Sequence, residues 1–303
     1  MTFLDTSLDT SISAPTLTGS ATLRHAGSHR LRRTAGIVAT YLLLLGAAAL
    51  TLAPFALSFM TAFKTPRQMA NEPALAAPNP VTFENFTRLV TDHNFITPVA
   101  VTAQVVLVVL IGQMVFSIMA AFAFAKLQFP LRDTLFWLYL ATLMVPQVVL
   151  VVPLFTMFTQ MDLRNTFWAL VLPWMFASPY AVFLLRQYFK GIPDDLIAAA
   201  RIDGAGTWRI LWQIVVPMSR PIISTLVIIT IVTHWNNFMW PLIITTGDTW
   251  QVITVATASL QTQHNANWTL VMAATTVAMA PLLVLYAIFQ RHIINSISLT
   301  GFK

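Results

Sequence analysis

The sequence predicts an all-α, polytopic membrane protein with six transmembrane helices, and three observations support this fold class. First, 57% of the 303 residues are hydrophobic and only 9% are charged, whereas soluble domains are about 45–50% apolar. Second, the apolar residues gather into runs that reach the roughly 20 residues needed to span a bilayer. Third, most lysines and arginines flank these runs. The chain therefore divides into membrane spans and connecting loops.

Six apolar runs are long enough to cross the membrane. Before the first lies an N-terminal stretch, residues 1–35, that is rich in Ser and Thr and ends in a cluster of arginines. Because it lacks apolar periodicity, we expect a disordered cytoplasmic tail. A cleaved signal peptide is disfavoured, since the following run exceeds the about 7–15 residues of a signal-peptide core. The transmembrane domain then occupies residues 36–303, with predicted spans at 36–59, 98–125, 134–158, 165–186, 221–244 and 268–290.

The basic residues orient the spans. If the N-terminal tail is cytoplasmic, 13 of the 17 Lys and Arg lie on the cytoplasmic side and four lie outside. Short cytoplasmic loops are enriched in Lys and Arg, so we expect both termini in the cytoplasm. The basic residues that flank the membrane spans account for the pI of about 10.1. We therefore expect contacts with membrane lipid and no nucleic-acid partner. The long outside loop, residues 64–97, is either a linker, which its composition favours, or a docking surface for a soluble partner.

The sequence lacks the residues that several classes of membrane protein need for their chemistry. No predicted span contains an Asp or Glu in its interior, and His234 is the one ionisable side chain deep in an apolar run. Proton-relay carriers and metal-dependent membrane enzymes need carboxylates or ligand clusters at that depth. The chain has no cysteine and no phosphate-binding loop of the G-x-x-x-x-G-K-[ST] type. We therefore expect no catalytic residue, no metal site and no cofactor bound by this chain.

Residues 190–217, which we call the island, are charged and rich in small residues between two apolar runs. Pro193 with Asp194 and Asp195 predicts a helix start, because carboxylates favour the positive end of the helix dipole. This short helix is expected to end near Asp203, followed by a glycine turn at Gly204 and Gly206.

A second island helix is predicted over about 207–216 and is closed by Pro217 and Pro221. Its apolar side is expected to carry Trp208, Leu211, Trp212 and Val215, opposite Arg209 and Gln213. An amphipathic helix lying on the inner leaflet is one interpretation. The acidic residues favour a protein partner instead, because an anionic leaflet repels them.

The island reads Ile192-Pro193-Asp194-Asp195-Leu196, then Ala199-Ala200-Arg201-Ile202-Asp203-Gly204-Ala205, then Ile214-Val215-Val216-Pro217. In this form it resembles the EAA loop of permease subunits of binding-protein-dependent ABC importers, most of all the second permease of the carbohydrate-uptake type. Further matching motifs lie at 123–130, 143–147, 164–166, 184–189 and 235–242, so the resemblance covers roughly residues 50–303.

The resemblance implies a type I importer permease with a cytoplasmic coupling helix, placed in a bacterial cytoplasmic (inner) membrane. Its partners would be a second permease subunit forming a heterodimer, a dimer of ATPase subunits that holds ATP and Mg, and an extracytoplasmic solute-binding protein or lipoprotein. One departure matters, because the glutamate of the family motif falls at Ala198. The implied ATPase-coupling residues are Asp194, Asp195, Ala198, Ala199, Arg201, Asp203, Gly204 and Ala205.

Polar and aromatic residues in the fifth span form the candidate solute path. They are interpreted either as hydrogen-bonding contacts between helices or as groups that meet a sugar, with a Trp face against its ring. The main candidates are His234, Trp235, Asn236, Asn237, Trp240 and Gln147, and weaker ones are Gln104, Gln113 and Thr142. No Lys or Arg lies in a span interior, which favours a neutral sugar or polyol. Glycerol phosphate or a glycerophosphodiester is the alternative.

Two functions from other classes remain open. A multi-pass membrane enzyme acting on lipid-linked sugars needs acidic residues near the membrane surface, and the loop carboxylates Asp162, Asp194, Asp195 and Asp203 lack metal-binding spacing. A stand-alone secondary carrier should show internal repeats and charges within the membrane, and the sequence has neither. Both are less consistent with the sequence than a transport subunit that is not itself an enzyme.

Overall fold

The computed structural model describes residues 23–262 and 267–298, and every secondary-structure element in these residues is helical. It falls into two units, divided between Ala56 and Leu57. The longer helices are α1 (Leu23–Ala62), α4 (Ile96–Lys126), α5 (Arg132–Ala141), α6 (Gln147–Gln160), α8 (Pro179–Lys190), α12 (Arg220–Trp235), α14 (Ile253–Thr262) and α15 (Trp268–Ser298). The shorter ones are α2 (Pro66–Asn71), α3 (Glu84–Thr91), α7 (Phe167–Val171), α9 (Asp194–Ile202), α10 (Thr207–Ile210), α11 (Val216–Met218) and α13 (Met239–Ile244), with a 3-10 turn at Thr142–Met144 and a π turn at Leu211–Val215.

Four helical segments in the described residues are long and apolar enough to cross a membrane, namely Gly36–Ala62, Ile96–Lys126, Arg220–Ile244 and Trp268–Gln290. A fifth candidate is the pair Arg132–Met144 and Gln147–Gln160, which bends by 95° at Pro146. The all-α, multi-span fold class is confirmed, while the count of six spans stays a prediction.

The predicted span at 165–186 is not one continuous helix. It is divided into α7 and α8, and residues 172–178 between them are not helical. Pro173 and Pro179 lie at this break, and a proline removes a backbone donor that a continuous helix needs. The next helix, α8, begins with Pro179 in its first turn, where a missing N–H costs nothing.

The structure describes part of the predicted N-terminal tail. The structure carries α1 back to Leu23, so residues 23–35 belong to the same helix as the first span. The rest of the predicted tail, residues 1–22, lies outside the described residues. A tail ending at residue 35 therefore stays a prediction.

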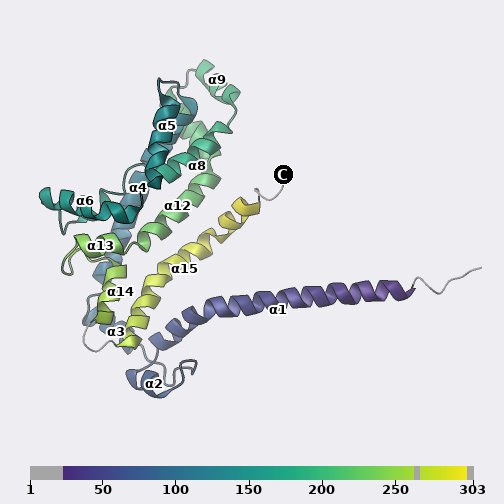
Figure 1. The fold of residues 1–303 in the computed structure, drawn as a ribbon, viewed down its shortest axis with the longest axis vertical. Helices are drawn as coiled ribbons and strands as arrows, with labels where there is room; N and C mark the ends of the chain where they lie inside the picture. The colour runs from purple at the N-terminus through teal and green to yellow at the C-terminus, as the bar shows by residue number, and fades with distance from the viewer. Residues whose placement is uncertain (1–22, 263–266, 299–303) are drawn as a thin grey trace, which may run out of the picture. The chain divides into compact units, whose positions relative to one another are not determined.

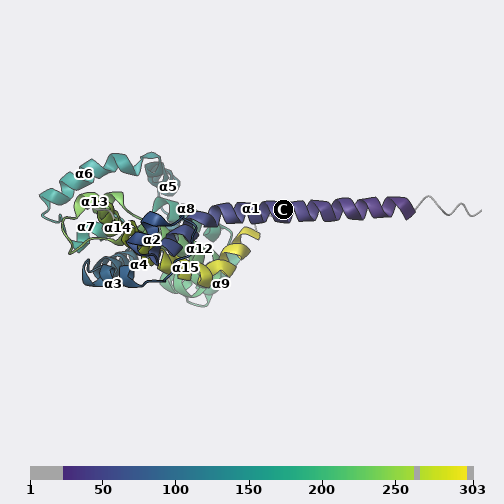
Figure 2. The same cartoon turned by 90° about the horizontal axis from the view of Figure 1, so that it is seen from below.

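The second unit is built around α4. This helix packs most extensively against α8 and also against α12, while α15 packs against α12, α14 and α3. Figure 1 shows α9 at one end of the α4, α8 and α12 packing, and α3 and α14 towards the other end; Figure 2 gives the same helices turned by 90°. The island and the long loop before α4 thus occupy opposite ends of this unit.

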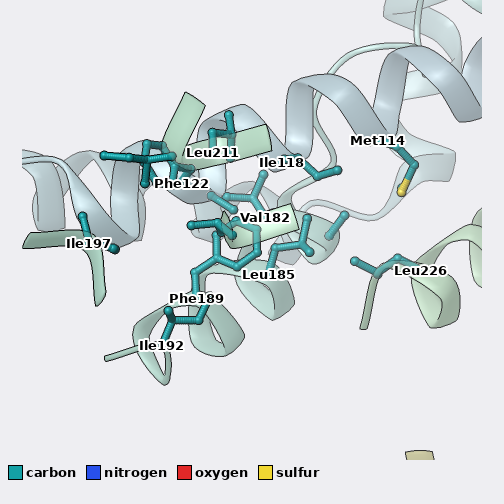
Figure 3. Packing of buried hydrophobic residues seen from close by; sticks show 14 of the residues in the cluster. Met114, Ile118, Phe122, Val182, Leu185, Phe189, Ile192, Ile197, Leu211 and Leu226 are labelled. Carbon is teal, nitrogen blue, oxygen red and sulfur yellow. The ribbon is translucent and has the colours of Figure 1, made fainter. Parts of the chain in front are cut away.

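A core of aliphatic and aromatic side chains lies near the island. Ile118 and Phe122 of α4 pack with Leu185 and Phe189 of α8, and Leu211 joins them from the π turn. Figure 3 shows these side chains together with Ile197 of α9. The island is thus held to the spans by its own buried side chains rather than projecting freely from them.

A buried hydrogen-bond node joins the end of α1 to the start of α15. Asn85 is 3% exposed, and its amide nitrogen donates to the carbonyl oxygens of Ala62 and Lys64, each at 2.8 Å. Its amide oxygen accepts from the Thr269 hydroxyl at 2.9 Å. Since buried polar groups must be paired, this one side chain fixes three segments that are far apart in the sequence.

Candidate functional site

The first island helix, α9, has the predicted form. It begins at Asp194 directly after Pro193 and carries Asp194 and Asp195 in its first turn. Ile197 is buried and packs on the α4 and α8 core, whereas Ala198, Ala199 and Arg201 on the same helix are exposed. The helix therefore presents a charged, small-residue surface while one aliphatic side chain anchors it.

Gly204 ends α9 in a Schellman motif. The Ala205 N–H donates to the Ala200 carbonyl at 2.9 Å, and the Gly204 N–H donates to the Arg201 carbonyl at 3.0 Å, the two bonds that define this motif. Gly204 has φ +79°, a left-handed conformation that favours glycine. Gly206, expected to share this role, has φ −71° and caps α10 instead. Asp203, between helix and turn, is exposed.

The side chain of Lys126, the last residue of α4, binds the start of α9. Its ammonium donates to the Ile192 carbonyl at 2.7 Å and to the Asp194 carboxylate at 2.6 Å. The hydrogen bond from Lys126 lowers the pKa of Asp194 below its usual range. Asp194 is therefore ionised at neutral pH and already paired within this chain.

A second anchor lies one helix away. The buried Arg186 of α8 stacks over the Phe136 ring at 3.8 Å and pairs with Asp133 of α5 at 2.6 Å. Its Nε also donates to the Phe124 carbonyl at 3.2 Å. The guanidinium group of Arg186 thus links the ends of α4, α5 and α8 that lie beside the island.

The second island helix differs from the prediction. It continues through a π turn into α11, which ends at Met218, and α12 begins at Arg220 after the non-helical Ser219. Pro217 therefore lies inside the last turn of this helix rather than after it. Ile210, Leu211 and Val215 are buried, but Trp208 and Trp212 are 61% and 42% exposed. The expectation that both tryptophans share a buried face with Leu211 and Val215 is wrong. For Trp212, the reason is that the π turn at Leu211–Val215 departs from the 3.6-residue period on which the expectation rested.

Two adjacent cavities lie where α12 faces the break between α7 and α8. Their volumes are about 340 and 220 Å³, and we call them the first and second cavity. Both are lined by Gln147, Trp174, Thr233 and His234. The His234 and Trp174 rings have centroids 6.1 Å apart. These two rings therefore lie at the junction of the cavities.

The structure brings some of the predicted solute-path residues together and separates others. His234 and Gln147 line both cavities, whereas Asn237 and Trp240 line only the second. Trp240 is 3% exposed, and its indole N–H donates to the Ala169 carbonyl at 2.9 Å.

Trp235 and Asn236 line neither cavity. Trp235 is buried and donates to the Ala278 carbonyl of α15 at 3.0 Å, so its indole joins two helices. Asn236 is exposed and bonds its own helix at the Val232 carbonyl oxygen, 2.8 Å away. Of the weaker candidates, Gln104 and Thr142 are exposed and line neither cavity.

Gln113 is the weaker candidate that reaches a cavity wall. It lines the first cavity, and its side-chain oxygen accepts from the Thr230 hydroxyl of α12 at 3.1 Å. At the preceding residue, Gly112 lets the backbone of the α7 to α8 break approach closely, because an added Cβ would lie 2.5 Å from the Met175 carbonyl oxygen. The position of the break therefore depends on α4 having no side chain there.

Trp174 is the functional candidate that the sequence did not reveal. It lines both cavities, and its indole N–H is buried without a hydrogen-bond partner among the described residues. A buried donor left unpaired costs about 1–3 kcal/mol, so it is suited to meeting an acceptor that enters the cavity. The signal that could have found it is its place between Pro173 and Pro179, where helical packing is interrupted.

In the part of the chain that the structure describes, no three His, Cys, Asp or Glu side chains gather as a metal site.

Comparison with known proteins identifies relatives over most of the chain. Residues 113–299 match the family described as binding-protein-dependent transport system inner membrane component. The arabinooligosaccharides transport system permease protein AraQ of Halalkalibacterium halodurans is 31% identical over 75% of this chain and 81% of its own length. The diacetylchitobiose uptake system permease protein NgcG of Streptomyces coelicolor is 31% identical over 93% of each chain. The sn-glycerol-3-phosphate transport system permease protein UgpE of Yersinia pestis is 31% identical over 82% of this chain and 91% of its own.

Solved structures support the same fold. A chain of a bacterial ABC transporter involved in the import of the acidic polysaccharide alginate superposes with a TM-score of 0.75 at 21% identity, covering 86% of this chain and 97% of that one. The sequence resemblance at the island, the helical architecture and the family match over residues 113–299 agree. The chain belongs to the family of inner membrane components of binding-protein-dependent transport systems, and its role is that of a permease subunit.

Proposed function

We propose that this chain is the permease subunit of an ATP-driven ABC importer for a neutral sugar, oligosaccharide or polyol. The observation that carries the solute class is the lining of the two cavities, which contains Gln, Thr, Ser, Tyr, Trp, Asn and His side chains but no Lys, Arg, Asp or Glu. Neutral donors and acceptors beside an indole ring suit a polyhydroxylated ring. Two relatives are named for the transport of arabinooligosaccharides and the uptake of diacetylchitobiose.

The phosphorylated alternative draws its support from the UgpE relatives, whose name states sn-glycerol-3-phosphate. A phosphate is usually met by Arg, Lys or a helix N-terminus. The residues lining the two cavities include no such cation, which favours the neutral solute for this chain. In the assembled importer a second permease subunit would complete the path.

The island is proposed to face the cytoplasm and to act as the coupling element, with both termini on the same side. Its basic surroundings, Lys126, Arg132, Lys190 and Arg201, support this orientation. ATP and Mg would be held by the ATPase dimer that contacts α9. Because the chain has no cysteine, a single cysteine introduced at Ala198 should react with an impermeant thiol reagent only in inside-out vesicles that have been stripped of the ATPase. Labelling in right-side-out vesicles would mean that the island faces the outside and would contradict the proposed orientation.

Assembly tests the proposed function. Purified in mild detergent, the chain should bring with it an ATP-hydrolysing subunit and a second multi-span permease. After reconstitution into proteoliposomes, the complex should take up solute only with its binding protein present. A chain that is stable alone and transports without ATP would contradict the proposal. The solute itself is identified by the ligands that the binding protein retains.

Replacing Trp174 by phenylalanine tests the solute path. An aromatic ring remains but the unpaired indole N–H is lost, so we expect uptake to fall about three- to tenfold, the effect of one hydrogen bond. Initial uptake rates in proteoliposomes measure this. Trp168→Phe is the matched control, because Trp168 is exposed on neighbouring α7 and lines neither cavity. Equal effects of the two substitutions would remove Trp174 from the path.

A further inference from the structure

Residues 59–86, which we call the knob, join the end of α1 to α3, and several of their side chains lie in the reverse of their usual places. Phe59 and Phe83 are 55% and 66% exposed. The buried polar side chains of the knob are Lys64, Gln68 and Asn85, which are 1%, 8% and 3% exposed. In proteins surrounded by water, charged and amide side chains are mostly exposed, and phenylalanine is among the residues most often buried. The knob therefore has a polar interior beneath a surface that exposes aromatic rings.

The buried polar side chains pair with carbonyl groups of the knob that belong to no helix. The Lys64 ammonium donates to the carbonyl oxygens of Pro73 and Ala74 at 3.3 and 3.4 Å. The Gln68 amide nitrogen donates to the carbonyl oxygen of Pro80 at 3.3 Å. Backbone polar groups in lipid need partners within the protein, because no water is there to replace them. The knob supplies such partners from its own side chains.

Phenylalanine rings in mutual contact give the knob its apolar surface, and Phe63 lies at their centre. Its ring centroid is 5.0 Å from those of Phe59 and Phe86 and 5.3 Å from that of Phe83. The Thr82 N–H donates to the Phe63 carbonyl oxygen at 3.0 Å, which holds the two parts of the knob together. The rings thus continue the apolar surface of the last turn of α1 onto the loop that follows it.

The length of the first span places these rings at the membrane surface. The span Gly36–Ala62 has 27 residues, which at about 1.5 Å each give a length of about 40 Å. The hydrocarbon core of a bilayer is about 30 Å thick, and the bilayer measures about 40–45 Å with its polar interfaces. Phe59 is one turn from the end of this span. It therefore lies at the depth of the interface, at the end of the second unit that is farther from the island.

We propose that the knob is seated in the interfacial region of the bilayer, with its phenylalanine rings against phospholipid. The contact lies where headgroups meet acyl chains, in the leaflet farther from the island. The inference needs only that the chain spans a membrane, so it does not depend on which solute is transported. Over residues 64–86 it gives the long loop a third use, different from a linker and from a docking surface for a soluble partner.

Two observations favour lipid over a soluble protein as the occupant. A loop that awaits a soluble partner is hydrated before docking, so water can pair its carbonyl groups, whereas buried side chains pair them in the knob. The charges that follow the rings are also compensated, because Glu84 and Arg88 form an ion pair at 2.8 Å. Segments that lie in the membrane interface combine polar groups at headgroup level with apolar side chains below them.

Nitroxide labels in the reconstituted complex test the proposal. The chain has no cysteine, so a single cysteine at Phe59 or Phe83 can be labelled once the other subunits are made cysteine-free. The complex is placed in vesicles of phosphatidylethanolamine and phosphatidylglycerol. Collisions of each label with oxygen and with the water-soluble complex nickel ethylenediaminediacetate are then measured. Oxygen concentrates in the apolar phase, whereas the polar nickel complex is excluded from it.

The ratio of oxygen to nickel collisions should be severalfold higher at Phe59→Cys and Phe83→Cys than at Asp92→Cys. Asp92 is the aqueous control, because it is exposed and charged at the end of α3. Val81→Cys is a second test site, since Val81 is 56% exposed and its replacement removes no aromatic ring. This site keeps the test decisive if loss of a phenylalanine ring prevents folding.

Two results would overturn the proposal. Ratios at the ring positions equal to that at Asp92 would place the rings in water. Low collision rates with both reagents would mean that protein covers the rings, and measurements with and without the solute-binding protein would show whether that protein is responsible. The labels report the depth of the knob whether or not a given solute is transported, so failure of this proposal and failure of the proposed function are distinguishable.

Discussion

Replacement of Gly204 by aspartate is expected to lower ATP-driven uptake about tenfold while leaving membrane insertion unchanged. Gly204 holds φ +79°, and an L-residue there costs roughly 1–2 kcal/mol, although Asp tolerates it better than most. The substitution strains the turn that sets the direction of α10 and places a new carboxylate beside Asp203. A cost near 1.4 kcal/mol corresponds to a tenfold change. Uptake in proteoliposomes and the amount of protein in the membrane measure the two effects.

Gly206→Asp is the matched control for that substitution. It adds the same charge to the same turn, but Gly206 has φ −71° and caps α10, a position where Asp is favoured. No atom lies within 4 Å of a Cβ added at either glycine, so steric clash does not distinguish them. Normal uptake in Gly204→Asp would refute the coupling role, and equal loss in both variants would assign the effect to charge.

Replacement of Gly112 by alanine is expected to reduce uptake at least as strongly. The new Cβ would lie 2.5 Å from the Met175 carbonyl oxygen, so either α4 or the break between α7 and α8 must shift. Overpacking of this kind costs about 1–3 kcal/mol. Because Trp174 precedes Met175, the shift also moves the indole that lines both cavities.

The Gly112 prediction is checked by uptake and by the thermal stability of the purified complex. Gly46→Ala is its control, since it makes the same change in the spanning helix α1, where no atom lies within 4 Å of the added Cβ. That control should match or slightly exceed wild type in stability, because alanine favours helix more than glycine. Unchanged uptake and stability in Gly112→Ala would mean that the segment between α7 and α8 can shift without affecting transport, and would contradict this prediction.

The features that the sequence predicted well are set by local signals. Pro193 with two carboxylates begins α9, and Gly204 ends it, because capping and dihedral preferences act over a few residues. The breaks beside Pro146 and Pro173 follow a local rule of the same kind, because a proline removes a backbone donor. The size of the 95° bend depends on packing against neighbouring helices, which a single sequence does not encode locally.

The candidate solute path was predicted only in part for a related reason. Polar residues at 234–237 marked the right turn of the fifth span, but the sequence does not give the rotation of that turn relative to α15. Trp235 therefore packs against Ala278, while Trp174, on a non-helical segment without periodicity, lines both cavities. Helical patterns predict what one helix buries, whereas a site between interrupted helices depends on contacts among several of them.

The node at Asn85 has a consequence for how the second unit can deform. One amide joins the end of α1, the helix α3 and the first turn of α15, and separating any of them leaves a buried polar group unpaired at about 1–3 kcal/mol. These three segments thus behave as a fixed pivot. If α15 moves during transport, we therefore expect its displacement to be smallest at Thr269 and to increase toward its far end.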